Sequence, residues 1–232
     1  MQCYLIGYPV EHSLSPIMHN TAFRRLGIDY RYEAVPVEPE YLGDFVEGTL
    51  RKSEVRGANV TIPYKVEVIK YLDEVDQEAA EIGAVNTIVN DEGSLKGYNT
   101  DGIGALRALK EAYGELEGRK VVLLGAGGAA RAIAYHLVGE VEVLVILNRT
   151  EGKALKLMEE LRERQRGLRV KVEGAGFSED RLEEELSDAD VVINATSVGM
   201  HPNVGQTSIP KELLNDRITV YDIVYNPLWT RL

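Results

Sequence analysis

Strand-like and helix-like stretches alternate along the whole sequence, which predicts an α/β protein with mainly parallel strands. Two further observations indicate two domains. The 232 residues are 44% hydrophobic, enough for two cores of ordinary size. An apolar strand followed by a glycine-rich turn, residues 121–130, lies near the middle of the chain. We therefore expect an N-terminal α/β domain over residues 1–102 and a doubly wound Rossmann domain over residues 103–232.

The first half of the chain has clear turn and capping signals. Ser15 and Pro16 form an N-cap and first-turn pair for a helix that Gly27 ends. Asn90-Asp91-Glu92-Gly93 has the residues of a hairpin turn. Apolar runs predict strands over 2–6, 31–37, 57–61, 84–89 and 95–98, and further helices over 39–52, 64–72 and 102–113.

The second half repeats a strand-then-helix pattern. Such repeats are typical of a doubly wound parallel sheet, in which helices cover both faces. The predicted strands cover residues 120–124, 142–147, 169–173, 190–194 and 218–223.

Charge and composition exclude several classes of function. The net charge of −11 divides into −8 for residues 1–102 and −3 for residues 103–232, so neither half attracts nucleic acid or an anionic membrane. No apolar run has the length of about 18 residues that a membrane helix needs. The single cysteine, Cys3, lies in an apolar strand and has no disulfide partner. We expect a soluble protein of the reducing cytoplasm, as a monomer or a homodimer.

The glycine-rich turn predicts a dinucleotide as cofactor. Gly125 permits the tight turn, Gly127 lets the backbone approach a pyrophosphate, and Ala130 fills the small third position of the fingerprint. The helix that follows offers free N–H groups to the phosphates. The expected phosphate-binding residues are Gly125, Ala126, Gly127, Gly128 and Ala129.

The next predicted strand selects between NAD and NADP. An NAD site usually has an acidic residue there, which binds the ribose 2′-hydroxyl. In this chain the strand ends in Asn148-Arg149-Thr150, with Lys153 one turn further on. Arg149 can bind a 2′-phosphate bidentately and Lys153 adds a second positive charge, so we expect NADP.

Four polar clusters in the first half are hard to explain by packing alone. Together with three motifs of the second half, they form the series S-x-S-P (13–16), N-V-T-x-P-x-K (59–65), G-A-V-N-T (83–87), N-T-D-G (99–102), G-A-G-G-A (125–129), N-R-T (148–150) and N-A-T-S-x-G-M (194–200). In the order and spacing of these motifs, the chain resembles the shikimate dehydrogenase family along essentially its whole length.

This resemblance implies a site for a small ring with one carboxylate and three hydroxyls. Short donors and acceptors on rigid elements suit such a ligand better than a large apolar pocket. The resemblance assigns the carboxylate to Ser13, Ser15 and Tyr225. It places around the ring hydroxyls Asn59, Thr61, Lys65, Asn86 and Asp101.

The implied reaction is the NADPH-dependent reversible reduction of 3-dehydroshikimate to shikimate. Hydride transfer to a carbonyl needs a group that manages the proton. Lys65 is the expected proton donor, and Asp101 orients Lys65 and binds a neighbouring hydroxyl. The residues expected to line the nicotinamide pocket are Thr196, Ser197, Met200 and Ile223.

No metal is expected, because hydride transfer of this kind needs none. None of the four histidines, His12, His19, His136 and His201, has the spacing of a metal-ligand motif.

Two alternatives stay open. A quinate/shikimate dehydrogenase with relaxed cofactor use fits the same motifs, although Arg149 and Lys153 argue against a preference for NAD. Family members usually continue for some tens of residues, with C-terminal helices that this sequence lacks. If that segment is truly absent, the chain is a non-catalytic module that binds NADP or shikimate.

Overall fold

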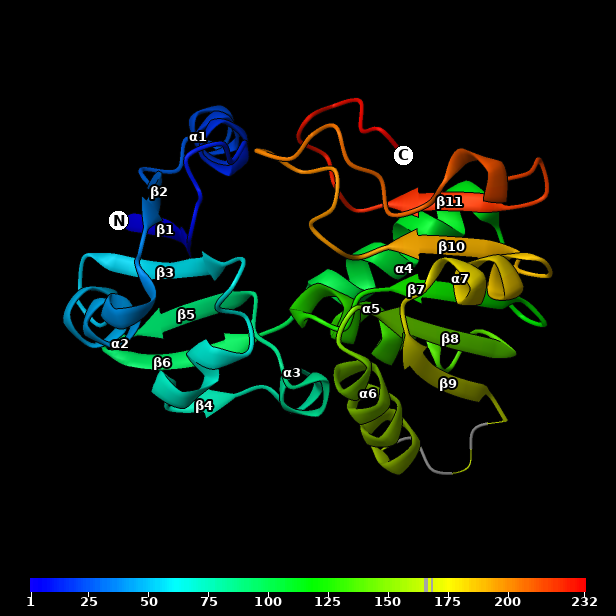
Figure 1. The fold of residues 1–232 in the computed structure, drawn as a ribbon. Helices are drawn as coiled ribbons and strands as arrows, with labels where there is room; N and C mark the ends of the chain where they lie inside the picture. The colour runs from blue at the N-terminus through cyan, green and yellow to red at the C-terminus, as the bar shows by residue number, and fades with distance from the viewer. Residues whose placement is uncertain (165–166, 168) are drawn as a thin grey trace. The chain divides into compact units, whose positions relative to one another are not determined.

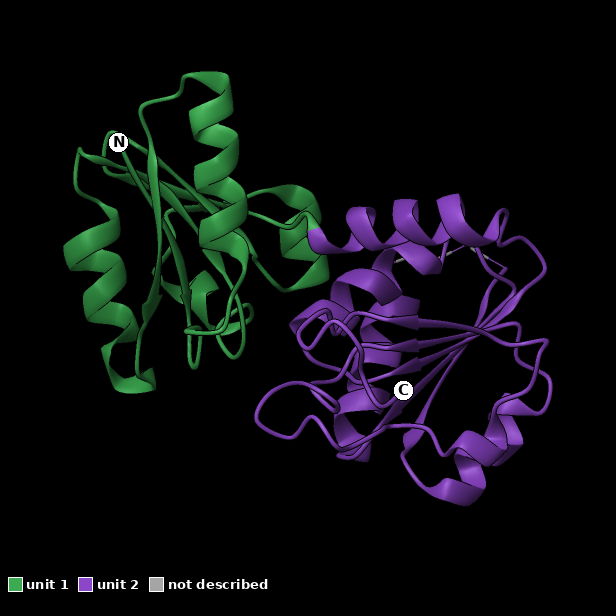
Figure 2. Cartoon of the chain, turned by 90° about the horizontal axis from the view of Figure 1, so that it is seen from above, with its two compact units in different colours: residues 1–100 green, residues 101–232 purple. Residues whose placement is uncertain are grey.

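The computed structural model describes residues 1–164, 167 and 169–232 of the chain. The chain divides into two compact units, Met1–Thr100 and Asp101–Leu232 (Figure 2). Each unit has its own sheet, which contains parallel strands, and its own core, so the predicted α/β class is confirmed.

In residues 1–100, six strands form one mixed sheet in the order β2-β1-β3-β5-β6-β4 (Figure 1). β1 is parallel to β2 and β3, whereas β5 is antiparallel to β3 and to β6. The strands are β1 (Gln2–Gly7), β2 (Arg31–Pro36), β3 (Val55–Val60), β4 (Glu74–Val75), β5 (Thr87–Asp91) and β6 (Ser94–Tyr98).

Helical segments pack against this sheet, whose side chains alternate between two faces. Leu5 packs in a cluster with Phe23 of α1, whereas its neighbour Ile6 packs in the larger cluster with Val46 and Leu50. The helical segments are α1 (Ser15–Leu26), α2 (Leu42–Phe45), α3 (Gln77–Ile82), two 3-10 turns (Pro39–Tyr41 and Glu67–Tyr71) and a π-helical turn (Val46–Leu50).

The prediction that Ser15 is the N-cap of the first helix was wrong. Leu14 occupies that position without a side-chain cap, and Ser15 is the first helical residue. The Ser15 N–H donates instead to the Ser13 hydroxyl oxygen at 3.2 Å, so Ser13 satisfies a free donor of the first turn. Gly27 ends the helix as predicted, with a left-handed φ of 66°.

Other boundaries in the first unit also differ from the prediction. The expected helix over 39–52 is three short segments, and only Glu67–Tyr71 of the expected 64–72 is helical. The hairpin loop is shorter than the predicted four residues, because Asp91 pairs with Ser94. Glu92 and Gly93 form its two-residue loop with positive φ values of 51° and 95°, the geometry of a type I′ turn.

In the described part of residues 101–232, five parallel strands form a sheet in the order β11-β10-β7-β8-β9 (Figure 1). The strands are β7 (Lys120–Leu124), β8 (Val143–Asn148), β9 (Lys171–Gly176), β10 (Val191–Asn194) and β11 (Thr219–Asp222). The helical segments are α4 (Asp101–Tyr113), α5 (Gly128–Leu137), α6 (Glu151–Arg164), α7 (Glu179–Leu186) and a 3-10 turn (Lys211–Leu213).

Helices cover both faces of this sheet. Val121 and Leu123 of β7 pack in a cluster with residues of α4, α5 and α6. Val122 and Leu124, one step along the same strand, pack with Leu182 of α7. Alternate residues of a fully buried strand therefore support two helical layers, and the predicted doubly wound Rossmann fold is confirmed.

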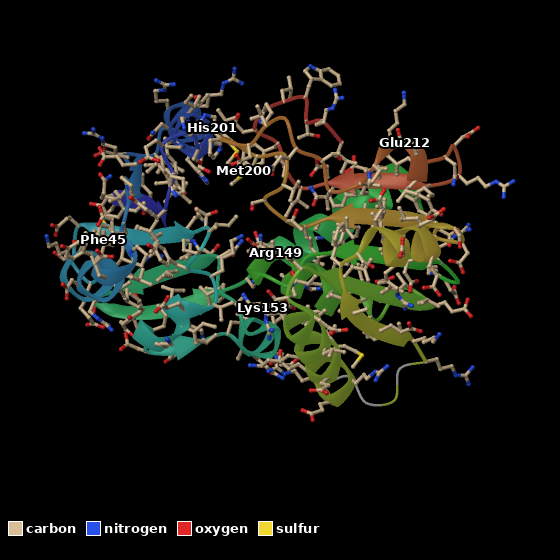
Figure 3. All side chains as sticks on the ribbon, viewed as in Figure 1. Phe45, Arg149, Lys153, Met200, His201 and Glu212 are labelled. Carbon is tan, nitrogen blue, oxygen red and sulfur yellow. The ribbon has the colours of Figure 1, made fainter. Side chains whose placement is uncertain are left out.

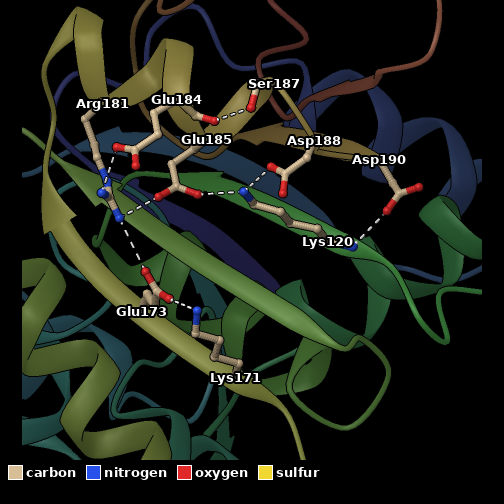
Figure 4. A network of polar contacts seen from close by, with 9 residues as sticks. All are labelled: Lys120, Lys171, Glu173, Arg181, Glu184, Glu185, Ser187, Asp188 and Asp190. Carbon is tan, nitrogen blue, oxygen red and sulfur yellow. Dashed lines mark hydrogen bonds and ion pairs between the residues drawn. The ribbon is translucent and has the colours of Figure 1, made fainter.

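A network of ion pairs joins α7 to β7 and β9 (Figure 4). Its centre is Glu185, 5% exposed, which lies 2.8 Å from Lys120 Nζ and 2.5 Å from an Arg181 guanidinium nitrogen. Arg181 also reaches Glu173 at 3.3 Å, and Lys120 pairs with Asp188. Burial opposes the charge of Lys120, but its bonds to Asp188 and Glu185 raise its pKa. The network therefore fixes α7 on the sheet through charged groups that depend on one another.

Replacing Glu185 tests this dependence. We expect Glu185→Ala to lower the free energy of unfolding by about 3 kcal/mol, because it leaves Lys120 and Arg181 without their shared buried partner. Glu184→Ala is the matched control. Glu184 also pairs with Arg181, at 2.9 Å, but its side chain is 68% exposed. We expect a change below about 0.5 kcal/mol for that control. Urea unfolding measures both, and equal small effects would contradict the expectation.

Candidate active site

One edge of the first unit's sheet collects most of the predicted substrate residues. β1 and β3 are parallel and end together, with Ile6 opposite Val60. Antiparallel β5 starts at this edge and β6 ends there, since Thr87 pairs with both Asn59 and Tyr98. The segments that carry the other predicted residues leave or enter the sheet at this edge. They contain Ser13, Ser15, Thr61, Lys65 and Asn86.

Ser13 and Ser15 lie in and just after the loop that follows β1. The Ser13 N–H donates to Val10 O at 3.0 Å, and the Ser13 hydroxyl donates to Ser15 Oγ at 3.2 Å. Both residues are half-buried. Two linked hydroxyls beside the N-terminus of α1 suit an anionic group, because the first turn of a helix carries partial positive charge.

Thr61 follows β3 and is packed against the end of β1. Its N–H donates to Ile6 O at 2.9 Å. A Cβ on Gly7 would lie 2.4 Å from Thr61 Cγ2, so only glycine permits this close approach. Thr61 is thereby held at a defined place on the edge.

Lys65 follows Tyr64, which is fully buried and whose hydroxyl donates to Val37 O just beyond β2. Burial raises the pKa of Tyr64, so the phenol remains a donor. The Lys65 carbonyl accepts a hydrogen bond from Val85 N at 2.7 Å. These bonds fix the backbone that carries the Lys65 side chain.

Asn86 is buried, and its side-chain amide joins two strand ends. Its Oδ1 accepts from Thr100 N at 3.0 Å and from Thr87 Oγ1 at 2.9 Å, and its Nδ2 donates to Thr100 Oγ1 at 2.9 Å. Because Thr100 N can only donate, the orientation of the Asn86 amide is determined. Asn86 therefore anchors the residue that directly precedes Asp101.

Asp101 and Tyr225 belong to the second unit. Asp101 is the first residue of α4, where a carboxylate is favoured by the helix dipole. Tyr225 follows β11 and is 59% exposed.

The glycine turn of the second unit has the geometry of a phosphate-binding turn. Gly125 has a φ of 114°, and a Cβ there would lie 2.9 Å from Ala195 O. Gly127 caps α5 at a φ of −83°, and a Cβ there would meet no described atom within 4 Å. The space in front of Gly127 is therefore open to a ligand that approaches the free N–H groups of α5. Gly128 and Ala129 form the first turn of α5.

Arg149 lies just before α6 and Lys153 lies in its first turn, beside the same edge (Figure 3). β7 and β8 end together, with Leu124 opposite Leu147. The Asn148 side chain donates to Thr150 O at 2.9 Å, which orders the turn that carries Arg149. Both cations are exposed, as groups that bind a phosphate from solution must be.

The loop after β10 carries Thr196, Ser197 and Met200, and Ile223 follows β11. A residue without a predicted role orders this loop. Asn194, fully buried, accepts from Thr196 Oγ1 at 2.7 Å and donates to Asp222 at 2.9 Å. The sequence signal for this role was an asparagine at the end of the apolar run of residues 191–193.

Among the residues that the structure describes, neither a metal-binding cluster nor a membrane-spanning helix is found. No group of three or more histidine, cysteine, aspartate or glutamate side chains there could hold a metal ion. In the same residues, no helix combines the length and apolar character needed to cross a membrane.

The fold and site together define a two-domain nicotinamide-nucleotide dehydrogenase, with polar residues on one α/β unit and a dinucleotide turn on the other. Residues 5–88 match the family model of the shikimate dehydrogenase substrate binding domain. Residues 107–224 match that of shikimate / quinate 5-dehydrogenase. The chain therefore belongs to the shikimate dehydrogenase family.

Known relatives agree with this assignment. The NADP(+) shikimate dehydrogenase of Geobacillus kaustophilus is 48% identical over 98% of this chain and 80% of its own length. A crystal structure of a shikimate dehydrogenase in complex with NADP+ superposes with a TM-score of 0.88 at 46% identity, covering 100% of this chain and 79% of that one. The Thermus thermophilus enzyme in complex with NADP(H) and shikimate gives a TM-score of 0.82 at 38% identity, covering 100% of this chain and 82% of that one.

Gly127→Ala tests the phosphate-binding turn. We expect the variant to fold, with a change in the free energy of unfolding below about 1 kcal/mol, because the added Cβ meets open space and leaves φ unstrained. The same methyl group blocks close approach of the pyrophosphate, so we expect the Kd for NADP+ to rise at least about tenfold.

Isothermal titration calorimetry measures this Kd. Gly139→Ala is the matched control, since a Cβ at that glycine also meets no described atom within 4 Å. An unchanged NADP+ affinity in Gly127→Ala would place the phosphates elsewhere.

Proposed function

We propose that this chain catalyses the reversible, NADPH-dependent reduction of 3-dehydroshikimate to shikimate, a step of aromatic amino-acid biosynthesis. One observation carries the proposal. A single chain of this family holds both a row of short polar side chains on one sheet edge and a glycine turn followed by Arg149. The first suits a small polyol acid and the second suits a phosphorylated dinucleotide.

Each side chain on the first unit has a proposed task. Ser13 and Ser15 bind the carboxylate of the substrate, with a contribution from Tyr225. Asn59, Thr61 and Asn86 bind ring hydroxyls, and their backbones are held by strand and loop hydrogen bonds. Such preorganised groups hold the ring in one orientation without further loss of side-chain entropy.

The second unit is proposed to hold NADP. The N–H groups at the start of α5, behind Gly125 and Gly127, bind the pyrophosphate. Arg149 and Lys153 bind the 2′-phosphate, which an acidic residue at this place would repel. Thr196, Ser197, Met200 and Ile223 contact the nicotinamide end. When bound, NADPH supplies the hydride that reduces the substrate carbonyl.

Lys65 and Asp101 are proposed as the catalytic pair. Lys65 donates a proton to the carbonyl oxygen of the substrate as that oxygen gains negative charge. Asp101 holds the ammonium group in place and accepts a hydrogen bond from a neighbouring hydroxyl. In the reverse direction Lys65 takes the proton back from the hydroxyl.

The cellular compartment and the oligomeric state are part of the same proposal. We expect it to work in the cytoplasm, as a monomer or a homodimer, with small molecules as its ligands.

Lys65→Ala tests the proton donor. In shikimate oxidation Lys65 acts as the general base, and removing it is expected to lower kcat by about 100- to 10,000-fold, with KM changed by less than about threefold. NADP+ reduction is followed by absorbance. Lys70→Ala is the control, because that side chain is 70% exposed and pairs only distantly with Glu67, at 3.7 Å. Near-normal turnover of Lys65→Ala would refute the role.

Arg149→Ala tests the cofactor preference. We expect KM for NADP+ to rise about tenfold or more, because a bidentate phosphate contact is lost, while KM for NAD+ changes little. Lys156→Ala is the control, on the helix that follows Arg149 and with a side chain 75% exposed. Equal changes for the two cofactors would argue against a 2′-phosphate contact.

The two alternatives are separated by one set of assays. Turnover of quinate with NAD+ above that of shikimate with NADP+ would identify a quinate/shikimate dehydrogenase. Binding of both ligands without turnover would identify a non-catalytic module.

A further inference from the structure

The side-chain amide of Asn59 has an orientation that its neighbours determine. Its Nδ2 lies 3.3 Å from Asn86 O and 3.2 Å from Thr87 Oγ1. A backbone carbonyl only accepts hydrogen bonds, so the nitrogen and not the oxygen must face it. The two hydrogens of Nδ2 have these two acceptors, and the carbonyl oxygen Oδ1 faces the other way.

Tyr32 occupies the other side of this amide. Its hydroxyl donates to Asn59 Oδ1 at 2.8 Å across 27 residues of sequence. An amide oxygen has two lone pairs, and in the described residues this one receives Tyr32 alone. The remaining lone pair is available to a donor on a ligand.

The Tyr32 ring is itself held firmly. Tyr32 is 3% exposed on β2, and its ring stacks on His19 with 4.3 Å between centroids and 13° between planes. Asn20 of α1 accepts from Tyr32 N at 2.9 Å and donates to Tyr32 O at 2.8 Å. Because β2 is the edge strand, these two bonds satisfy backbone groups that no further strand pairs. The hydroxyl therefore points to Asn59 from a rigid base.

The polar chain continues beyond Asn59. Thr87 Oγ1 accepts from Asn59 Nδ2 and donates to Asn86 Oδ1 at 2.9 Å. Donor and acceptor alternate from Tyr32 through Asn59 and Thr87 to Asn86, so the direction of every bond follows from its neighbours.

We propose that Tyr32 is a positioning residue of the active site, which sets Asn59 to accept a hydrogen bond from a ring hydroxyl of the substrate. Tyr32 does not touch the substrate. It acts by occupying one lone pair of Asn59 Oδ1 and holding the amide in the plane in which the second lone pair is presented. This inference rests on the proposed function, because it assigns a direction to one contact of that site.

Tyr32→Phe is the first test, because it keeps the stacked ring and removes the hydroxyl. With shikimate and NADP+, we expect kcat/KM for shikimate to fall about three- to tenfold through a higher KM, the loss that one hydrogen bond accounts for. KM for NADP+ is expected to stay within about twofold. A role confined to stability would lower the melting temperature and leave the KM for shikimate unchanged, which would overturn the proposal.

A double-mutant cycle tests whether Tyr32 acts through Asn59. Asn59→Ala removes the amide, and adding Tyr32→Phe to it is expected to change kcat/KM by less than about twofold further. Fully additive effects would contradict the proposal. Tyr30→Phe is the matched control, since this nearby tyrosine packs edge-on against Phe23 at 5.6 Å. It should retain wild-type values.

The direction of the hydrogen bond is tested with shikimate analogues in which a non-reacting ring hydroxyl is replaced by fluorine, which accepts but does not donate. For the wild type, we expect one of these analogues to bind at least about fivefold more weakly than shikimate. In Asn59→Ala, the two affinities should become equal. Equal binding of every analogue would refute acceptance by Asn59. Wild-type protein without shikimate turnover would instead refute the proposed function, so the two failures are distinguishable.

Discussion

Parallel strands end together at one edge of a sheet, and the rest of this molecule depends on that constraint. In the first unit β1 and β3 deliver the segments with Ser13 and Thr61 to one edge, and antiparallel β5 begins there with Thr87. In the second unit β7, β8 and β10 place Gly125, Arg149 and the loop after Asn194 along a common edge. The candidate functional side chains lie at these edges because both faces of each sheet are covered by apolar packing.

Polar groups that lie at such an edge need partners, and their partners give them direction. Asn86 and Asn194 are both buried, and each binds a backbone or side-chain group of another strand end. A buried amide with every bond satisfied costs little and has one orientation. The amino end of the second sheet is held differently, by charged groups around Glu185. Directional hydrogen bonds thus hold the edge that carries the candidate site, and ion pairs hold the amino end of the second sheet.

Sequence patterns predicted the fold class and the glycine turn because both depend on local spacing. Gly125 needs a positive φ and Gly127 needs open space, requirements that a short motif records. The prediction failed where two local signals competed. Ser15 looked like an N-cap, yet Ser13 supplies the hydroxyl that its N–H binds. The two-residue hairpin loop was missed because cross-strand pairing of Asp91, not turn composition, decides where the strand ends.

The sequence by itself determined the family, the two α/β units and the residue types of the candidate site, since these follow from motifs within a few positions. Tertiary structure decided how those residues are oriented. Tyr32 and Thr87 received no role from sequence patterns, because their bonds to Asn59 cross between strands about 27 residues apart. The direction of a hydrogen bond depends on what lies beyond each partner, and only the folded chain brings those partners together.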